Sequence, residues 1–293
     1  MAQKEWSGQT GGTDWMQNAL VVLFRIFPLW SMYGILALFI PFYMIFNHKE
    51  YVAIYRYFHL HRKQRWLQAF VNVYRNHYIF AEEMFDRFAF YAGKHFKIAG
   101  EGWDILDEQL KEPGGFIMLS SHVGNFELAG YTLKMDCKRI NSLVYSGEKK
   151  AVMEQRRKAL AKQGVRMVPV SEDMSHLFII NSALGNGEVV SMPGDRVFGS
   201  QKAAECRFID APAKFPLGPF ALSVQLDAPI ISVSVMKTGL KSYYVIVKRV
   251  ECESKAKGRE KMANLAQIFA SQLEEVVNEY PLQWFNYFNF WND

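Results

Sequence analysis

Two side chains, those of His122 and Glu127, have the types and the spacing of an acid–base pair suited to acyl transfer. A neutral imidazole can accept the proton of an attacking hydroxyl group. A carboxylate bonded to the other ring nitrogen fixes the tautomer and stabilises the imidazolium ion. Because a substrate hydroxyl would attack directly, this chemistry needs no nucleophile from the protein. The alternative interpretation is that a histidine and a glutamate lie at this spacing on the surface by chance. The secondary structure predicted around the pair helps to choose between the two interpretations.

The chain around this pair predicts a strand, a turn and then a helix. Phe116–Ser120 predicts a strand, Gly124 permits an unusual backbone angle, and Asn125 is a favoured first capping residue of a helix. Residues five apart in one continuous helix are separated by about 140° around its axis and could not meet. His122 and Glu127 can meet if they straddle this turn. The backbone N–H groups at the start of this helix could then hold an oxyanion, and Gly124 and Asn125 are expected to line the substrate site.

Downstream of residue 95, short apolar runs alternate with amphipathic segments, which predicts an α/β domain whose mixed, largely parallel central sheet is flanked by helices. Ligands usually bind at the carboxyl ends of such strands, where His122 is expected. The predicted strands are Phe116–Ser120, Leu143–Tyr145, Val165–Val170, Glu188–Met192, Ile230–Met236 and Tyr243–Val250. The predicted helices are Asn125–Lys134, Lys149–Lys162, Met174–Leu184, Leu217–Leu226 and Lys257–Glu279.

The N-terminal part contains a long apolar segment from Ala19 to Phe46, whose start is interrupted by Arg25 and Pro28. The 18 residues of Leu29–Phe46 carry no charge, which is long enough for a membrane-spanning helix. A basic flank follows, so the positive-inside rule predicts that the later residues are cytoplasmic. Two alternatives remain open: a buried helical hairpin broken at a proline, and a helix that lies in the membrane interface.

A second N-terminal helix is predicted over Arg65–Tyr91, where apolar residues recur at spacings of three and four. The pattern changes near residues 92 to 100. We therefore expect a helical membrane-attachment region over residues 1–92 and an α/β domain over residues 93–293. The aromatic tail from Trp284 to Trp291 is expected to pack against the N-terminal helices.

Composition limits the classes of partner. Of the 293 residues 50% are hydrophobic, and the formal net charge of +5 fits an anionic partner such as lipid headgroups or an acidic carrier protein. Neither a nucleotide phosphate-binding loop nor the nucleophile motif of α/β-hydrolases occurs. The three cysteines lie far apart, so no metal site or disulfide framework is expected. No cofactor is expected either. A nucleic-acid partner is not expected, because the basic residues after Phe46 follow an apolar run.

The pattern H-x-x-x-x-E formed by His122 and Glu127 resembles the first motif of the lysophospholipid acyltransferase superfamily. The fuller string HVGNFELAG resembles the branch of bacterial lipid A biosynthesis acyltransferases, which includes lauroyl and myristoyl transferases. Later segments are similar to further motifs of that branch in order and interval: Met192–Arg196, Phe215–Pro219, Asp227–Ile230 and the terminal Pro281–Phe285. The resemblance implies an enzyme of the bacterial inner membrane, with its catalytic domain on the cytoplasmic side.

By this resemblance, an acyl chain moves from a thioester of acyl carrier protein or coenzyme A to a hydroxyl of a membrane lipid, such as a lipid A precursor. His122 is the expected general base and Glu127 its orienting partner. Other acceptors stay open, namely a lysophospholipid, an amino-acid lipid or a glycolipid. A non-catalytic membrane protein that retains the fold is a further alternative.

The resemblance also implies residues that bind substrate. Arg156 and Arg157 are adjacent candidates for contact with a substrate phosphate, although their charged neighbours equally favour a solvated helix face. Asp195 and Arg196 are expected to shape the acceptor or donor site. For Asp195 the alternative interpretation is a turn residue after Gly194.

Overall fold

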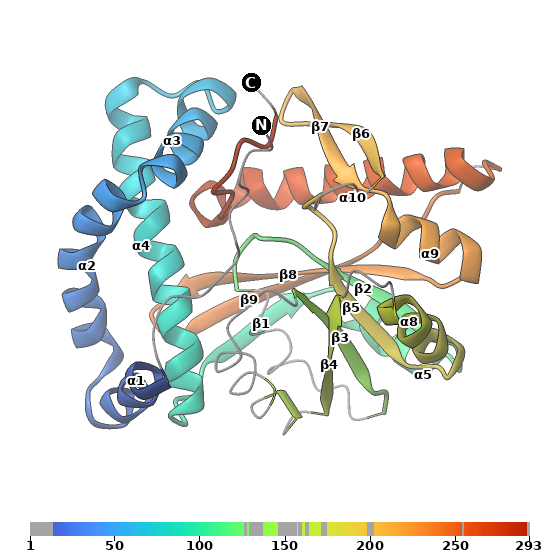
Figure 1. Ribbon diagram of the computed structural model, residues 1–293, viewed down its shortest axis with the longest axis horizontal. Helices are drawn as coiled ribbons and strands as arrows, with labels where there is room; N and C mark the ends of the chain where they lie inside the picture. Colours follow the sequence, from blue (N-terminus) through green and yellow to red (C-terminus); the bar gives the residue numbers. More distant parts are fainter. Residues whose placement is uncertain are drawn as a thin grey trace.

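The computed structural model describes residues 14–125, 128, 137–145, 157, 160–161, 164–170, 175–197, 202–253 and 255–291. Its N-terminal part is a group of helices on one side of the molecule (Figure 1). Two of them, α1 (Asp14–Ile26) and α2 (Leu29–Phe46), are separated at Pro28, whereas Pro41 lies inside α2. After α3 (His48–Arg56) and a π-helical turn (Tyr57–His61), the long helix α4 (Trp66–Tyr91) packs against both α1 and α2.

The centre of the molecule is a seven-stranded sheet with the order β1-β9-β8-β2-β5-β3-β4. All neighbouring strands are parallel except β8 and β9, which form an antiparallel pair. The largely parallel mixed sheet predicted from the sequence is therefore confirmed. The strands are β1 (Lys97–Glu101), β2 (Phe116–Ser120), β3 (Ile140–Tyr145), β4 (Val165–Val170), β5 (Val189–Pro193), β8 (Ile230–Gly239) and β9 (Ser242–Arg249).

Both faces of the sheet are covered, and successive residues of β2 serve the two faces in turn, as strand geometry requires. Ile117 and Leu119 belong to the core beneath α10 (Gly258–Glu279), and Phe116 and Met118 to the core on the other face, which includes residues of α5 (Trp103–Lys111). Helices α8 (Ser175–Gly185) and α9 (Gly218–Leu226) complete the first layer, and the antiparallel hairpin of β6 (Ala203–Phe208) and β7 (Ala211–Pro216) packs on α10.

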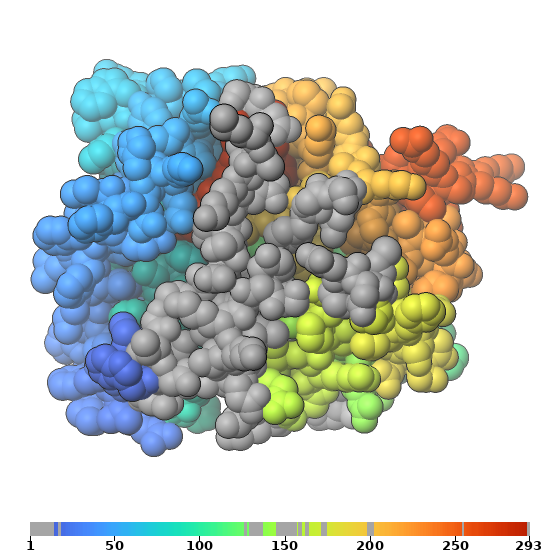
Figure 2. Space-filling model, in the orientation of Figure 1, coloured from blue at the N-terminus to red at the C-terminus, as the bar shows by residue number. Residues whose placement is uncertain are grey.

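The C-terminal tail joins the two parts of the chain, as the sequence predicts. Trp284 packs edge-on against Tyr57, and Trp291 stacks on His61 with ring centroids 3.6 Å apart. In Figure 2 this tail lies between the N-terminal helices and the β6–β7 hairpin. One apolar core contains residues of α2, α4, α10 and the tail. The division of the chain at residue 92 coincides with the end of α4 and otherwise stays a prediction.

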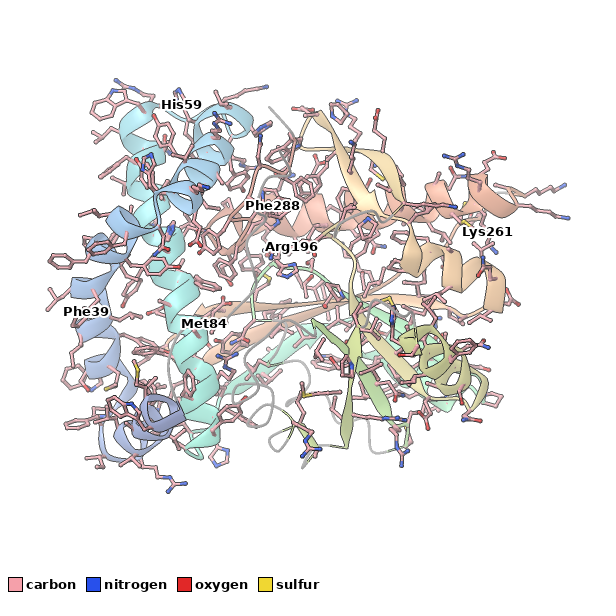
Figure 3. All side chains as sticks on the ribbon, in the orientation of Figure 1. Phe39, His59, Met84, Arg196, Lys261 and Phe288 are labelled. Carbon is pink, nitrogen blue, oxygen red and sulfur yellow. The ribbon has the colours of Figure 1, made fainter. Side chains whose placement is uncertain are left out.

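Helix α2 is apolar on all sides, and its outer side faces away from the protein. Of the residues described, Leu29–Phe46 forms the helix long and apolar enough to cross a membrane, judged by length and composition, and 33% of that span is buried. Phe39 points away from the rest of the molecule (Figure 3), and Phe46 is 84% exposed. Large apolar residues on α1 and at the start of α4 are exposed as well, among them Trp15, Ile26, Trp66 and Leu67.

Candidate active site

His122 and Asp195 are brought together by the register of two neighbouring parallel strands. Ser120, the last residue of β2, pairs with Pro193, the last residue of β5. The backbone N–H of Gly194 then donates to the carbonyl of Ser120 at 2.8 Å. Two residues beyond each strand end lie His122 and Asp195, at the carboxyl edge of the sheet. The sequence placed His122 there correctly, but it gave Asp195 a role in shaping the substrate site.

The carboxylate of Asp195 holds His122 by two bonds. Its Oδ1 lies 2.8 Å from Nδ1 of the imidazole, and its Oδ2 accepts the backbone N–H of His122 at 2.8 Å. Because a carboxylate is an acceptor, Nδ1 carries the ring proton and Nε2 keeps its lone pair. Asp195 is buried, while 19% of the His122 side chain is exposed. This geometry presents Nε2 as a base and fixes the orientation of the ring.

The charges at the site favour a neutral imidazole beside an ionised carboxylate. Burial, together with the positive charge of Arg196, lowers the pKa of His122 below its ordinary 6.5, against the opposing effect of Asp195. Burial opposes ionisation of Asp195, but the electrostatic attraction and hydrogen bonds of the His122 ring and backbone N–H groups, together with the charge of Arg196, hold its pKa below 3.8. A neutral imidazole near pH 7 is the form that can accept a proton.

Arg196, which directly follows Asp195, is a buried cation. Its Nη2 donates to the carbonyl of Phe285 at 2.9 Å, and its guanidinium lies 5.3 Å from the ring centroid of Phe288. The two side chains meet near the centre of the molecule in Figure 3. Burial lowers the pKa of Arg196 to about 10, which still leaves it protonated at neutral pH. It therefore partly balances the charge of Asp195.

The turn after His122 is held from two sides. The N–H of Gly124 donates to the carbonyl of Gln283, and the N–H of Phe285 donates to the carbonyl of His122, at 2.8 and 2.9 Å. From the sheet, the carbonyl of Val235 in β8 accepts the N–H of Asn125 at 2.8 Å. The backbone amides of Gly124 and Asn125 are thus used inside the protein. These two N–H groups therefore have acceptors within the protein, and contacts of Gly124 and Asn125 with a substrate stay a prediction.

Two residues of this turn have types that the conformation requires. Gly124 has a φ of +60°, and a Cβ atom there would lie 2.2 Å from the carbonyl oxygen of Val235. Only glycine fits such a position without strain. The Oδ1 atom of Asn125 accepts the N–H of Leu128 at 3.2 Å, which is the contact expected of an N-terminal helix cap.

Gln283 links the C-terminal tail to the site. Its side-chain amide bonds both backbone groups of Lys237 in β8 at 2.8 Å, and its own carbonyl accepts Gly124 as described. Gln283 is buried. The terminal segment that the sequence marked only by resemblance therefore has a physical role, because it fastens the His122 turn to the sheet.

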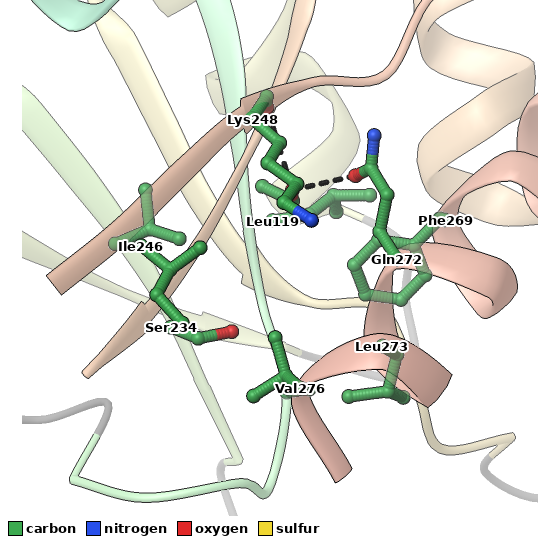
Figure 4. A pocket seen from close by; sticks show the side chains of 11 residues that line it. Leu119, Ser234, Ile246, Lys248, Phe269, Gln272, Leu273 and Val276 are labelled. Carbon is green, nitrogen blue, oxygen red and sulfur yellow. Dashed lines mark hydrogen bonds between the residues drawn. The ribbon is translucent and has the colours of Figure 1, made fainter. Parts of the chain in front are cut away.

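Helix α10 supports the segment that carries Asp195. A Cβ atom at Gly194 would lie 2.9 Å from a ring carbon of Phe269, so the absence of a side chain permits this close approach. Beside it a small pocket opens between the sheet and α10, bordered by Leu119, Phe269 and Val276 (Figure 4). Ser232 also lines this pocket, and its hydroxyl donates to Gln272 at 2.7 Å.

The remaining predicted residues lie partly outside the described chain. Glu127 and Arg156 are outside the described residues, so their roles stay predictions. Arg157 is helical and exposed, and its contact with a substrate phosphate also stays a prediction. The contact that the sequence predicts for Glu127, to the imidazole ring, is made at Nδ1 by Asp195.

One comparison with known proteins, the match to a family model, agrees with the motifs. The family model described as bacterial lipid A biosynthesis acyltransferase matches residues 68–292. No curated protein sequence matches the chain. Among solved structures, the 1-acyl-sn-glycerophosphate acyltransferase PlsC of Thermotoga maritima is similar, with a TM-score of 0.41 and 13% identity over 93% of this chain and 99% of that one.

Proposed function

Since this chain belongs to the bacterial lipid A biosynthesis acyltransferase family, we propose that it transfers a fatty acyl chain from an acyl thioester to a hydroxyl of a lipid A precursor. Family membership supports an acyltransferase that acts on a lipid-like acceptor. The observation that carries the proposal further is the bond between His122 and Asp195 at the carboxyl edge of the sheet.

The proposed reaction is a direct attack on the thioester. Nε2 of His122 takes the proton from the acceptor hydroxyl as its oxygen bonds to the thioester carbonyl carbon. Asp195 stabilises the resulting imidazolium ion through Nδ1. The carbon–sulfur bond then breaks, and the imidazolium returns its proton to the departing thiolate. The products are the ester and the free thiol of the carrier, and His122 is again neutral.

The proposed partners follow from charge and family. Acyl carrier protein or coenzyme A would supply the thioester, and both are anionic, which fits a chain with a formal net charge of +5. Arg156 and Arg157 are the proposed contacts for a phosphate of the acceptor. Glu127 is proposed as a second carboxylate near the site, five residues after His122.

The proposed location is the inner membrane, with the catalytic part on the cytoplasmic side. Exposed apolar residues of α1, α2 and the start of α4 support attachment to a bilayer, because water does not favour so much exposed apolar surface. Exposed basic residues accompany them and suit anionic headgroups, namely Lys49, Arg56, Lys63 and Arg65.

Lipid analysis of cells tests the proposed acceptor. A strain that lacks this protein is compared by mass spectrometry with strains that carry the natural chain or the His122→Ala variant. We expect lipid A to lack one acyl chain in the first and third strains. If lipid A is unchanged in the strain that lacks the protein and a phospholipid or another acylated lipid is altered instead, that lipid is the acceptor. Full restoration of the lipid by His122→Ala would overturn the proposed base.

A further inference from the structure

A charged pair, Asp86 of α4 and Lys237 of β8, lies buried next to the active-site turn. Their side chains are 0% and 6% exposed, and the ammonium nitrogen lies 2.5 Å from Oδ2 of Asp86. Two phenol groups complete the cluster, because Tyr33 of α2 and Tyr243 of β9 each donate to Asp86. A buried carboxylate needs such donors, because a charge that is buried without partners is strongly unfavourable.

The aromatic rings also hold Lys237. Its ammonium nitrogen lies 5.0 Å from the ring centroid of Tyr33 and 5.3 Å from that of Tyr243, within the range of a cation–π interaction. The cluster therefore joins α2, α4, β8 and β9 through one carboxylate. If the cluster only stabilised the core, apolar residues of similar volume could replace it, because they often stabilise a core as well as a buried ion pair does. A further role for the cluster is therefore worth seeking.

One member of the cluster reaches the His122 turn. The amide Nδ2 of Asn125 donates to the hydroxyl of Tyr243 at 3.3 Å and to the backbone carbonyl of Glu83 at 3.2 Å. Burial and the charge of Asp86 raise the pKa of Tyr243 well above its ordinary value, so its hydroxyl keeps its proton. That single proton goes to Asp86, which leaves the oxygen free to accept from Asn125.

We propose that Tyr243, fixed by Asp86 and Lys237, is a positioning residue that sets the His122 turn through the side chain of Asn125. This rests on the proposed function, since it needs a reaction at His122. Asn125 is three residues from His122 and caps the following helix. A displacement of about 1 Å at a catalytic group can lower a rate by about 100-fold, so a modest shift of the turn is measurable.

Two matched variants test the proposal. Tyr243→Phe and Tyr33→Phe each remove one hydroxyl that donates to Asp86, but of these two tyrosines only Tyr243 bonds to Asn125. Both are measured as the full chain in phospholipid vesicles, with lauroyl-acyl carrier protein and a purified lipid A precursor. We expect Tyr243→Phe to lower kcat about ten-fold with KM within about two-fold, and Tyr33→Phe to keep kcat, at similar melting temperatures.

A double-mutant cycle tests whether Tyr243 acts on the His122 turn through Asn125. Asn125→Ser keeps a capping oxygen and removes the amide donor. If the link runs from Tyr243 to Asn125, the double variant has the kcat of the slower single variant. If the losses of kcat caused by Tyr243→Phe and Asn125→Ser instead multiply in the double variant, the positioning role is overturned. Equal losses of kcat in Tyr243→Phe and Tyr33→Phe would also overturn it. Activity retained by His122→Ala in the same assay would instead refute the proposed base, and no acylation by the natural chain would refute the proposed function.

Discussion

The active-site segment and helix α2 differ in which kind of side chain they bury and which they expose. Around His122 the protein buries charges, with Asp195 only 1% and Arg196 7% exposed, whereas α2 exposes large apolar side chains such as Phe46 at 84%. Both patterns are unusual for a water-soluble chain, where charges lie outside and large apolar patches are covered. The difference teaches that neither region has the surface that folding in water alone would favour, which fits the proton transfer proposed for one region and the membrane attachment proposed for the other.

Replacement of the buried carboxylate has the largest expected effect on activity. Asp195→Asn keeps the shape of the side chain but favours the wrong tautomer of His122 and cannot stabilise an imidazolium ion. We expect kcat to fall by at least about 1000-fold, since the corresponding substitution in a catalytic triad lowers kcat about 10,000-fold. Steady-state kinetics with a thermal-unfolding control measures this. A loss below about three-fold would show that Asp195 does not orient the base.

Charged residues introduced on the outer side of α2 should weaken the binding of the protein to membranes. Phe39 and Phe42 are 63% and 62% exposed, so their replacement by Glu should leave the fold intact and remove the protein from membranes. We expect at least about a ten-fold loss in vesicle binding, because each buried Phe contributes about 2 kcal/mol to transfer from water. The matched control is Ala263→Glu on the exposed side of α10. Equal vesicle binding by the natural chain and the double variant would contradict the lipid-facing assignment.

A smaller effect on stability and activity is expected from alanine at Gly124, for which Gly114 is the control because its surroundings differ. Gly124 has a positive φ and lies against Val235, whereas a Cβ atom at Gly114 would meet nothing within 4 Å. Gly124→Ala should lower the free energy of unfolding by at least about 1–2 kcal/mol. Activity should fall with it, because the His122 turn must move. Gly114→Ala should change neither quantity in denaturant titrations and assays, and equal effects of the two substitutions would argue against a tightly held turn.

The pH dependence should show the smallest effect near neutrality. Protonation of His122 removes the base, so kcat/KM should fall as pH decreases through its pKa, which burial and Arg196 place below 6.5. Activity should therefore be nearly constant from pH 7 to about 8 and decline on the acidic side. Circular dichroism over the same range separates this from unfolding. A midpoint above 7 would contradict the neutral imidazole.

The sequence predicted those elements whose patterns are local. Phe116–Ser120 and Val165–Val170 are strands with the bounds expected, and Pro28 separates the apolar helices. It did not predict β1, whose residues alternate between exposed and half-buried positions at the sheet edge, nor the β6–β7 hairpin. Pro212 and Pro216 argue against a central strand, but a separate two-stranded hairpin tolerates them.

The site was predicted only in part, because its second member depends on tertiary register. His122 follows a recognisable strand and precedes a recognisable turn. Asp195 lies 73 residues away, and its contact with His122 follows from the pairing of Ser120 with Pro193. Periodicity predicts that β2 and β5 are strands but not that they are neighbours. The cluster around Asp86 has the same origin, since α2, α4, β8 and β9 meet only in the folded chain.

The central claim is that His122 deprotonates a lipid hydroxyl for acyl transfer. The direct measurement mixes the purified chain in phospholipid vesicles with lauroyl-acyl carrier protein and a lipid A precursor, and follows the acceptor by mass spectrometry. The account predicts that the acceptor gains the mass of one lauroyl chain with the natural protein and none with a folded His122→Ala variant. Equal acylation by both proteins would contradict it.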